Sequence, residues 1–382
     1  MSCITPDDWH DLCDEITNHT EASRVRVVVI GSKNVGKSSL VRFLSTKMLK
    51  SASSSICTLE TDCGQPENTP PGILSYSSRS LVPDTGRFRT SIESQRFLGF
   101  VNPAVDPFQY IETIEKLYDD FQSRDSDKPL IVNCHGYGQS VGLETWQAII
   151  TLIRPHIVVH ILSEGNPALE MREPIQFLSS PHPTPKPEWR ALSPIIIVEN
   201  AQIDTPYQAS SVDYRWIKFA QHFRPDLVLK NEYWASHPRD FFVFPYTRAI
   251  TFQRAHVQLL FPNSDFVPHD PLRAINQLIV GLCDSKTGQF VCLAFVAGYT
   301  ETEIRFIIPP NILKSKMDTV DSVWRGHINW SPRDKVSYKG KTSSYESTVD
   351  EPYYLTHVLG GVDTGARQAR TRVDLKRRRT NE

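Results

Sequence analysis

The stretch Gly31-Ser32-Lys33-Asn34-Val35-Gly36-Lys37-Ser38 decides how this chain is expected to fold. It fits the pattern G-x-x-x-x-G-K-[ST] of a phosphate-binding loop (P-loop) without a mismatch. Residues 25–30 precede it as a β-branched, mostly apolar strand, and residues 39–44 follow it with the apolar spacing of a helix. A strand, a glycine-bounded turn and a helix start together point several backbone N–H groups toward a polyphosphate. The sequence therefore predicts a nucleotide site here; the alternative is a glycine turn that fits the pattern by chance.

The side chains of this loop have separate predicted roles. Lys37 is expected to reach the β- and γ-phosphates, and the Ser38 hydroxyl is expected to reach Mg²⁺. The predicted nucleotide-binding residues are Gly31, Ser32, Lys33, Asn34, Val35, Gly36, Lys37, Ser38 and Ser39.

The composition is typical of a soluble globular protein. The chain has 382 residues, 40% of them hydrophobic and 22% charged, which suits one large or two ordinary domains. No apolar run reaches the roughly 18 residues of a membrane span. The seven cysteines form no C-x-x-C pair, so we expect reduced thiols in a cytosolic or nuclear compartment.

The pattern of apolar runs predicts two kinds of sheet. After the opening strand, further β-rich apolar runs alternate with helical stretches, which is typical of a parallel sheet covered on both faces. From about residue 249 onward, short strands separated by turns predict a β-rich second domain, with residues 284–288 as a hairpin connection. The expected fold class is therefore α/β, a P-loop NTPase with a doubly wound parallel sheet, followed by a smaller β-rich C-terminal domain.

We predict four segments along the chain. These are a short N-terminal lead-in at 1–24, a kinase-type P-loop domain with a lid at 25–244, a β-rich domain at 245–335, and a weakly ordered basic tail at 336–382. The end of the tail, residues 365–382, carries seven Lys or Arg against Asp374 and Glu382, a net charge of +5. This run favours a nuclear address or a tether to RNA phosphates over a merely solvated tail.

Asp62 is the candidate catalytic carboxylate. It follows the second predicted strand, whose end can lie beside the phosphate loop in a doubly wound sheet. A carboxylate there can hold the Mg²⁺ shell through water or accept a proton from an attacking hydroxyl. The alternative is an Asp that only caps the next turn. With Lys37 and Ser38, Asp62 supplies the parts that phosphoryl transfer requires.

Two other polar residues are weaker candidates. Arg215 and Lys218 are three residues apart in a helical stretch, so they share a face that can close over the γ-phosphate as a lid. From spacing alone, a solvated and ion-paired helix face is the favoured interpretation. His135 follows the third strand, where a hydrogen-bonding role is more common than catalysis. The chain lacks the N-K-x-D segment of guanine-specific GTPases.

The P-loop and a second motif together resemble a known family. The second motif is D-C-G-Q-P-E-N-T-P-P-G at residues 62–72. The pair is similar to motifs of the polynucleotide 5′-hydroxyl kinases of pre-ribosomal RNA processing. These kinases form a nucleolar branch, and the kinases of pre-mRNA 3′-end formation form its sister branch. Trp9 and residues 210–215, 279–283 and 292–298 also resemble that family. The resemblance extends over roughly residues 6–330, most strongly up to residue 150.

The resemblance implies a function and assigns residues to it. It implies ATP or GTP as donor, Mg²⁺, and an RNA with a 5′-hydroxyl end as acceptor. It makes Lys37, Asp62 and Arg215 catalytic, places Mg²⁺ on Ser38 and, through water, on Asp62, and makes Gln65 the polar neighbour toward RNA. It also implies an rRNA-processing endonuclease as partner, a role in ribosome biogenesis, and localisation in the nucleus and nucleolus.

A departure from the family keeps a second function open. The family's T-x-G-W turn is replaced by Cys134-His135-Gly136-Tyr137, and a thiol substitutes poorly for a hydroxyl toward Mg²⁺-bound water. The alternative function is a catalytically weak nucleotide-binding scaffold for an rRNA-processing endonuclease. A metabolic kinase for a small hydroxyl compound is a third possibility.

Overall fold

The computed structural model describes residues 7–19, 22–51, 54–82, 88–138, 141–161, 195–198, 211–223, 248–261, 268–276 and 278–328. The chain divides into two compact units. The first comprises residues 1–69, 73–98 and 106–208, and the second comprises residues 70–72, 99–105 and 209–382. The basic tail lies outside the described residues, and the domain boundaries predicted from the sequence stay predictions.

A seven-stranded sheet forms the centre of the first unit, in the order β4-β3-β2-β5-β1-β6-β7. The five strands from β2 to β7 in that order are parallel, and β3 and β4 are antiparallel additions at one edge. The strands are β1 (Arg26–Gly31), β2 (Ser55–Glu60), β3 (Ile73–Leu81), β4 (Phe88–Phe97), β5 (Leu130–Asn133), β6 (Ile157–Ile161) and β7 (Ile195–Val198). The predicted parallel sheet is confirmed, while the β3–β4 hairpin was not foreseen.

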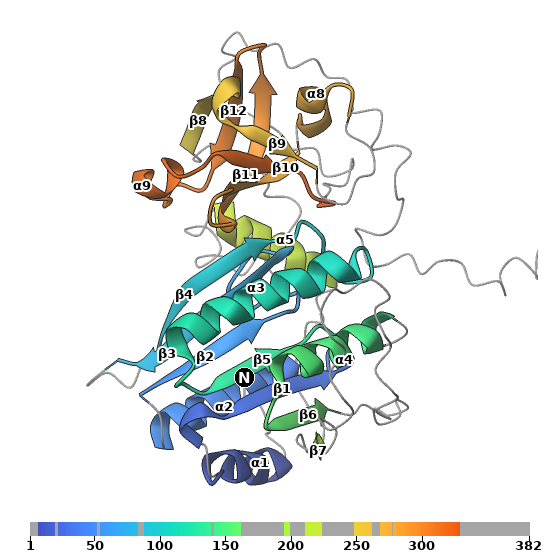
Figure 1. Ribbon diagram of the computed structural model, residues 1–382, viewed down its shortest axis with the longest axis vertical. Coiled ribbons are helices and arrows are strands. Elements are labelled where there is room, and N and C mark those ends of the chain that lie inside the picture. The colour runs from blue at the N-terminus through green and yellow to red at the C-terminus, as the bar shows by residue number, and fades with distance from the viewer. Residues whose placement is uncertain are drawn as a thin grey trace, which may run out of the picture. The chain divides into compact units, whose positions relative to one another are not determined.

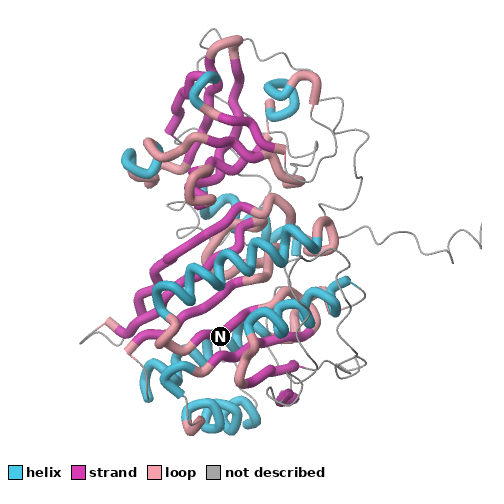
Figure 2. The backbone as a smooth tube through the Cα atoms, in the orientation of Figure 1, coloured by secondary structure: helices cyan, strands magenta, loops and turns pink. Residues whose placement is uncertain are grey.

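Helices cover both faces of this sheet (Figures 1 and 2). They are α1 (Asp7–Thr17), α2 (Lys37–Ser51), α3 (Pro107–Asp125) and α4 (Val141–Ile153). On one face Val27 and Val29 of β1 share a core with Trp9 of α1 and Leu40 of α2. Because side chains alternate along a strand, the intervening residues of β1 face the other side, where α3 and α4 lie against the sheet. Continuous apolar strands such as residues 27–30 fit this burial on both faces.

Local signals in the sequence fix where α3 begins. Asp106 is extended and its side chain accepts a hydrogen bond from the Gln109 N–H at 2.9 Å, while Pro107 takes the first helical position. An Asp cap followed by proline satisfies the free N–H groups of a first turn and presets its backbone.

The second unit is β-rich, with a six-stranded sheet in the order β8-β12-β11-β10-β13-β9. Its strands are β8 (Arg248–Gln253), β9 (Gln258–Leu260), β10 (Ile279–Asp284), β11 (Gln289–Tyr299), β12 (Glu303–Ile308) and β13 (Ser322–Trp324), and its helices are α5 (Ser211–Phe223), α8 (Pro271–Ile275) and α9 (Lys314–Met317). The predicted hairpin connection between β10 and β11 is confirmed. Helix α5 joins this sheet, because His222 Nε2 accepts a hydrogen bond from the Leu293 N–H at 3.2 Å.

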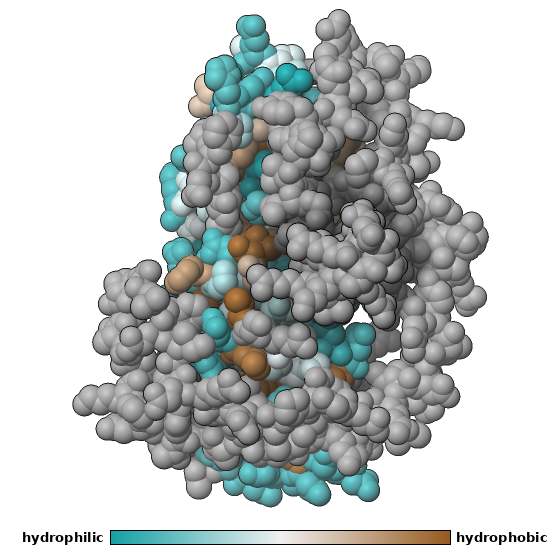
Figure 3. Space-filling view, turned by 90° about the vertical axis from the view of Figure 1, so that its right-hand side faces the viewer, coloured by the Kyte–Doolittle hydropathy of each residue, from teal (hydrophilic) through white to brown (hydrophobic). Residues whose placement is uncertain are grey.

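The described surface holds few large exposed apolar side chains. Those more than a third exposed are Leu81, Ile92, Phe108 and Leu313. In the space-filling view, hydrophobic residues lie among hydrophilic ones on the face shown (Figure 3). Among the described helices, none combines the length and the apolar character that a membrane crossing requires.

Candidate functional site

The P-loop connects β1 to α2 through a tight backbone turn. Asn34 and Gly36 adopt positive φ angles of 64° and 97°, in the region that glycine and asparagine tolerate best. Gly31 allows a close approach, because a Cβ there would lie 2.7 Å from the Ile161 carbonyl oxygen. Helix α2 begins at Lys37, and the Leu40 N–H donates to the Gly36 carbonyl at 2.9 Å. The turn therefore leads directly into a helix N-terminus, which favours an anion.

Lys37 is held by a hydrogen bond within this loop. Its Nζ donates to the Ser32 carbonyl oxygen at 2.7 Å, and the residue is only 7% exposed. Burial lowers the pKa of Lys37, and the negative charge of Asp62 acts against this by raising it. The ammonium group therefore lies within electrostatic reach of Asp62.

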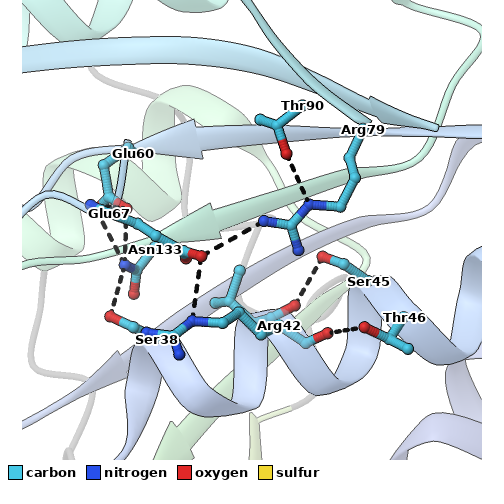
Figure 4. A network of polar contacts seen from close by, with 10 residues as sticks. Ser38, Arg42, Ser45, Thr46, Glu60, Glu67, Arg79, Thr90 and Asn133 are labelled. Atoms are coloured by element: carbon cyan, nitrogen blue, oxygen red, sulfur yellow. Dashed lines mark hydrogen bonds and ion pairs between the residues drawn. The ribbon is translucent and has the colours of Figure 1, made fainter. Parts of the chain in front are cut away.

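Ser38 is linked to two polar residues at the ends of neighbouring strands (Figure 4). Asn133 ends β5 and Glu60 ends β2, and the two are partners in the strand register. The Asn133 amide nitrogen donates to Ser38 Oγ at 3.2 Å and to the two Glu60 oxygens at 3.0 and 3.1 Å. A relay therefore joins the P-loop hydroxyl to the strand that carries the second motif.

The oxygens at this point suit a hard cation. Mg²⁺ prefers oxygen ligands and keeps several of its waters. The Asn133 Oδ1 atom is buried and has no hydrogen-bond partner among the described residues, although buried polar atoms normally have one. Ser38 Oγ and the orphaned Asn133 oxygen are therefore oxygen donors of the kind that Mg²⁺ prefers.

Glu60 organises the loop that follows β2. It is 2% exposed, and its carboxylate accepts hydrogen bonds from the Asp62 N–H at 3.2 Å and the Glu67 N–H at 3.3 Å. Burial, with a further contribution from the charge of Asp62, raises the pKa of Glu60 to about 8. Glu60 and Asn133 were not predicted as site residues from the sequence. The sequence feature that could have identified them is a polar residue at the end of each of two largely apolar strands.

Asp62 caps the turn that it begins. Its Oδ1 atom accepts hydrogen bonds from the Gly64 N–H at 2.9 Å and the Gln65 N–H at 3.0 Å. The turn cap considered from the sequence is thus present, and it uses the same carboxylate that acts on the pKa of Lys37. Because both bonds end on Oδ1, the cap leaves Oδ2 for other contacts. The catalytic role of Asp62 and the RNA-binding role of Gln65 stay predictions.

Arg215 lies on α5 in the second unit and is 8% exposed. Its burial argues against the solvated helix face considered from the sequence. Its role as a lid residue stays a prediction.

His135 is a structural residue rather than a proton carrier. Its Nδ1 accepts a hydrogen bond from the Tyr137 N–H at 3.1 Å, and its Nε2 lies 2.8 Å from Thr145 Oγ1, which in turn donates to the Gly142 carbonyl. Burial lowers the pKa of His135 to about 3, with the charge of Lys37 contributing. The ring also stacks on Trp146. These contacts indicate that His135 is neutral and that it fixes the turn after β5.

Cys134 is equally unsuited to hold a metal-bound water as a thiolate. It is fully buried, and burial raises the pKa of its thiol to about 12. The thiol therefore stays protonated and does not act as an anionic ligand.

Gly136 is expected to be essential for the shape of the P-loop. A Cβ at this position would lie 2.9 Å from Lys33 Cα and 3.0 Å from the Lys33 nitrogen. The variant Gly136→Ala must therefore push the P-loop backbone away, at a cost of about 1–3 kcal/mol in the free energy of unfolding. We also expect weaker nucleotide binding. Thermal unfolding and titration with a fluorescent ATP analogue test this, and unchanged values of both would contradict the close packing.

Comparisons with known proteins agree with this geometry. Residues 31–181 match the family model described as the mRNA cleavage and polyadenylation factor CLP1 P-loop. The structure of the wild-type Clp1p–Pcf11p complex has a chain that is 14% identical, with a TM-score of 0.58, covering 86% of this chain and 80% of that one. The chain thus has a P-loop NTPase fold with a β-rich second unit, and the predicted fold class is confirmed.

Several proteins with similar sequences are named polynucleotide 5′-hydroxyl kinases. The polynucleotide 5′-hydroxyl-kinase nol9 of Dictyostelium discoideum is 29% identical over 170 residues, which are 42% of this chain and 25% of the relative. The polynucleotide 5′-hydroxyl-kinase grc3 of Schizosaccharomyces pombe is 30% identical over 176 residues, which are 42% of this chain and 24% of the relative. The predicted resemblance to the polynucleotide 5′-hydroxyl kinases is therefore confirmed. The match spans about a quarter of the length of these relatives.

Proposed function

We propose that this chain is a polynucleotide 5′-hydroxyl kinase that transfers the γ-phosphate of ATP or GTP to the 5′-hydroxyl end of an RNA. The observation that carries this proposal is the polar relay from Ser38 through Asn133 to Glu60, which joins the P-loop to the strand preceding Asp62. It is supported by the likeness to relatives of that name.

The proposed reaction uses the side chains as follows. The 5′-hydroxyl oxygen attacks the γ-phosphorus, the bond from that phosphorus to the bridging oxygen breaks, and the nucleoside diphosphate leaves with the bonding electron pair. Asp62 accepts the hydroxyl proton, in the manner of a general base. Lys37 and Arg215 stabilise the charge on the transferred phosphoryl group, and Gln65 contacts the RNA near its end.

The metal site is the second part of this proposal. Ser38 and, through water, Asp62 would hold Mg²⁺, with the Asn133 oxygen beside them. When bound, Mg²⁺ supplies positive charge to the β- and γ-phosphate oxygens. Asn133 keeps the Ser38 hydroxyl oriented toward this position through its 3.2 Å hydrogen bond.

The biological setting proposed here is rRNA processing and ribosome biogenesis in the nucleus and nucleolus, with an endonuclease as partner. The basic run at residues 376–379 suits a nuclear address. A fluorescent reporter fused to residues 365–382 is expected to move to the nucleus, whereas a diffuse reporter would argue against the address.

The experiment that tests the activity is phosphate transfer from γ-labelled ATP to an RNA oligomer with a 5′-hydroxyl end. The same RNA carrying a 5′-phosphate is the matched control, because it has no acceptor oxygen. Label is expected only on the hydroxyl-ended RNA. Tight nucleotide binding with no transfer would instead support the scaffold function, and full competition by free nucleosides would support a small-molecule kinase.

A further inference from the structure

One residue of the second motif has contacts that the proposed chemistry does not use. Glu67 lies in the loop of residues 61–69, which follows β2 and carries Asp62 and Gln65. The loop is closed internally by the bonds to Asp62 Oδ1 and, near its end, by the Thr69 hydroxyl, which donates to the Ile73 carbonyl at 3.1 Å. These contacts set the shape of the loop but do not connect it to the P-loop helix.

The Glu67 carboxylate makes that connection (Figure 4). Its Oε1 atom lies 3.1 Å from Arg42 Nε and 3.5 Å from Arg79 Nη2. Arg42 belongs to α2, the helix that begins with Lys37 and Ser38, and Arg79 belongs to β3. One carboxylate thus bridges the helix of the P-loop and the strand beside β2.

The backbone of Glu67 is tied as well as its side chain. Its N–H donates to Glu60 Oε2 at 3.3 Å, and Glu60 is in turn bonded to Asn133, which reaches Ser38. Two routes therefore lead from Glu67 to the start of α2, one through the buried relay and one through Arg42. Few geometries of the loop satisfy both.

The exposure of the three partners indicates what this bridge does. The side chain of Arg42 is 58% exposed, while those of Arg79 and Glu67 are 12% and 20% exposed. An ion pair with an exposed partner contributes little to the stability of a whole protein. We expect the effect of the Glu67 bridge to be local. The guanidinium groups of Arg42 and Arg79 meet at one carboxylate, and they would repel each other if that carboxylate were neutral.

We infer that Glu67 is a positioning residue, which fixes the Asp62 loop against the P-loop helix so that Asp62 faces the phosphates held by Lys37. The effect on catalysis rests on the proposed function. The effect on the loop does not, since it follows from the contacts of Glu67 alone.

The variant Glu67→Gln tests this inference, because it keeps the size of the side chain and removes its charge. We expect faster amide hydrogen exchange in residues 63–69, with little change in β1 and β5. We also expect kcat for 5′-phosphorylation to fall about tenfold or more, since small displacements of reacting groups are costly. Nucleotide affinity is expected to stay within about twofold of the wild type, because the loss falls on positioning rather than on binding.

Two kinds of variant complete the experiment. Glu112→Gln is the matched control, because Glu112 is an exposed partner of Lys116 on α3 at 2.7 Å; it is expected to change none of these readouts. Arg79→Met should reproduce the faster exchange of the loop. Unchanged exchange and unchanged kcat in Glu67→Gln would overturn the inference. If the wild-type protein has no kinase activity, the exchange measurement still decides whether Glu67 holds the loop.

Discussion

Replacing Lys37 with methionine is expected to lower the rate of phosphate transfer to RNA by about a hundred- to a thousandfold, the usual effect of removing one group that stabilises transition-state charge. The methionine side chain has a similar length but cannot donate to a phosphate. Lys37 is buried and its pKa is lowered by that burial, so the wild-type protein keeps a poorly solvated charge at this point. The free energy of unfolding is therefore expected to change little in the variant.

The measurement compares Lys37→Met with Lys50→Met, which removes an exposed lysine from the last turn of the same helix. Single-turnover transfer from labelled ATP gives the rate, and chemical denaturation gives the stability. A large loss of rate with preserved stability is the expected pattern. Equal activity of the two variants would show that the Lys37 ammonium takes no part in the reaction.

The P-loop was predictable from the sequence because its local pattern leaves few conformations. Positive φ angles at Asn34 and Gly36, the buried strand β1 and the helix start at Lys37 all follow from residue types that are adjacent in the chain. The parallel strands were predictable for a similar reason, since an apolar β-branched run signals burial on both faces.

The parts that were missed depend on contacts between distant residues. The β3–β4 hairpin has polar and charged side chains such as Arg79 and Glu93 along an edge, so it lacks the apolar run of a buried strand. Glu60 and Asn133 meet only because β2 and β5 are neighbours in register. No local pattern in the sequence predicts that pairing, because the two residues are far apart in the chain.

The same distinction between local and tertiary features applies to the two interpretations of Asp62. The turn cap is a local feature, and it is present in the hydrogen bonds from the Gly64 and Gln65 N–H groups. The approach to Lys37 is a tertiary feature, which follows from the order of β2, β5 and β1 in the sheet. Asp62 can therefore accept the hydrogen bonds of its own loop with one oxygen while its charge acts on Lys37.

Asp62→Asn is expected to lower kcat by about a hundred- to ten-thousandfold, the range in which a general base contributes. The asparagine amide oxygen can still accept the hydrogen bonds from Gly64 and Gln65, so the turn is expected to persist. Asp62→Ala removes the base and the cap together, and it should also destabilise the loop. If the turn cap were the only role of Asp62, asparagine would leave the rate nearly unchanged and only alanine would lower it.

Asp62 can also affect the rate indirectly, by keeping Lys37 protonated. The pH dependence of the rate distinguishes this indirect effect from the role of Asp62 as the general base. The charge of Asp62 raises the pKa of Lys37 against the effect of burial, so Asp62→Asn is expected to lower the pKa of Lys37 further. A loss caused by a deprotonated Lys37 would be relieved as the pH falls, because the ammonium form would return. A loss caused by the missing base would not be relieved in acid. We expect the rate of Asp62→Asn to stay low as the pH is reduced; recovery of the rate in acid would assign Asp62 to the support of Lys37 rather than to the RNA hydroxyl.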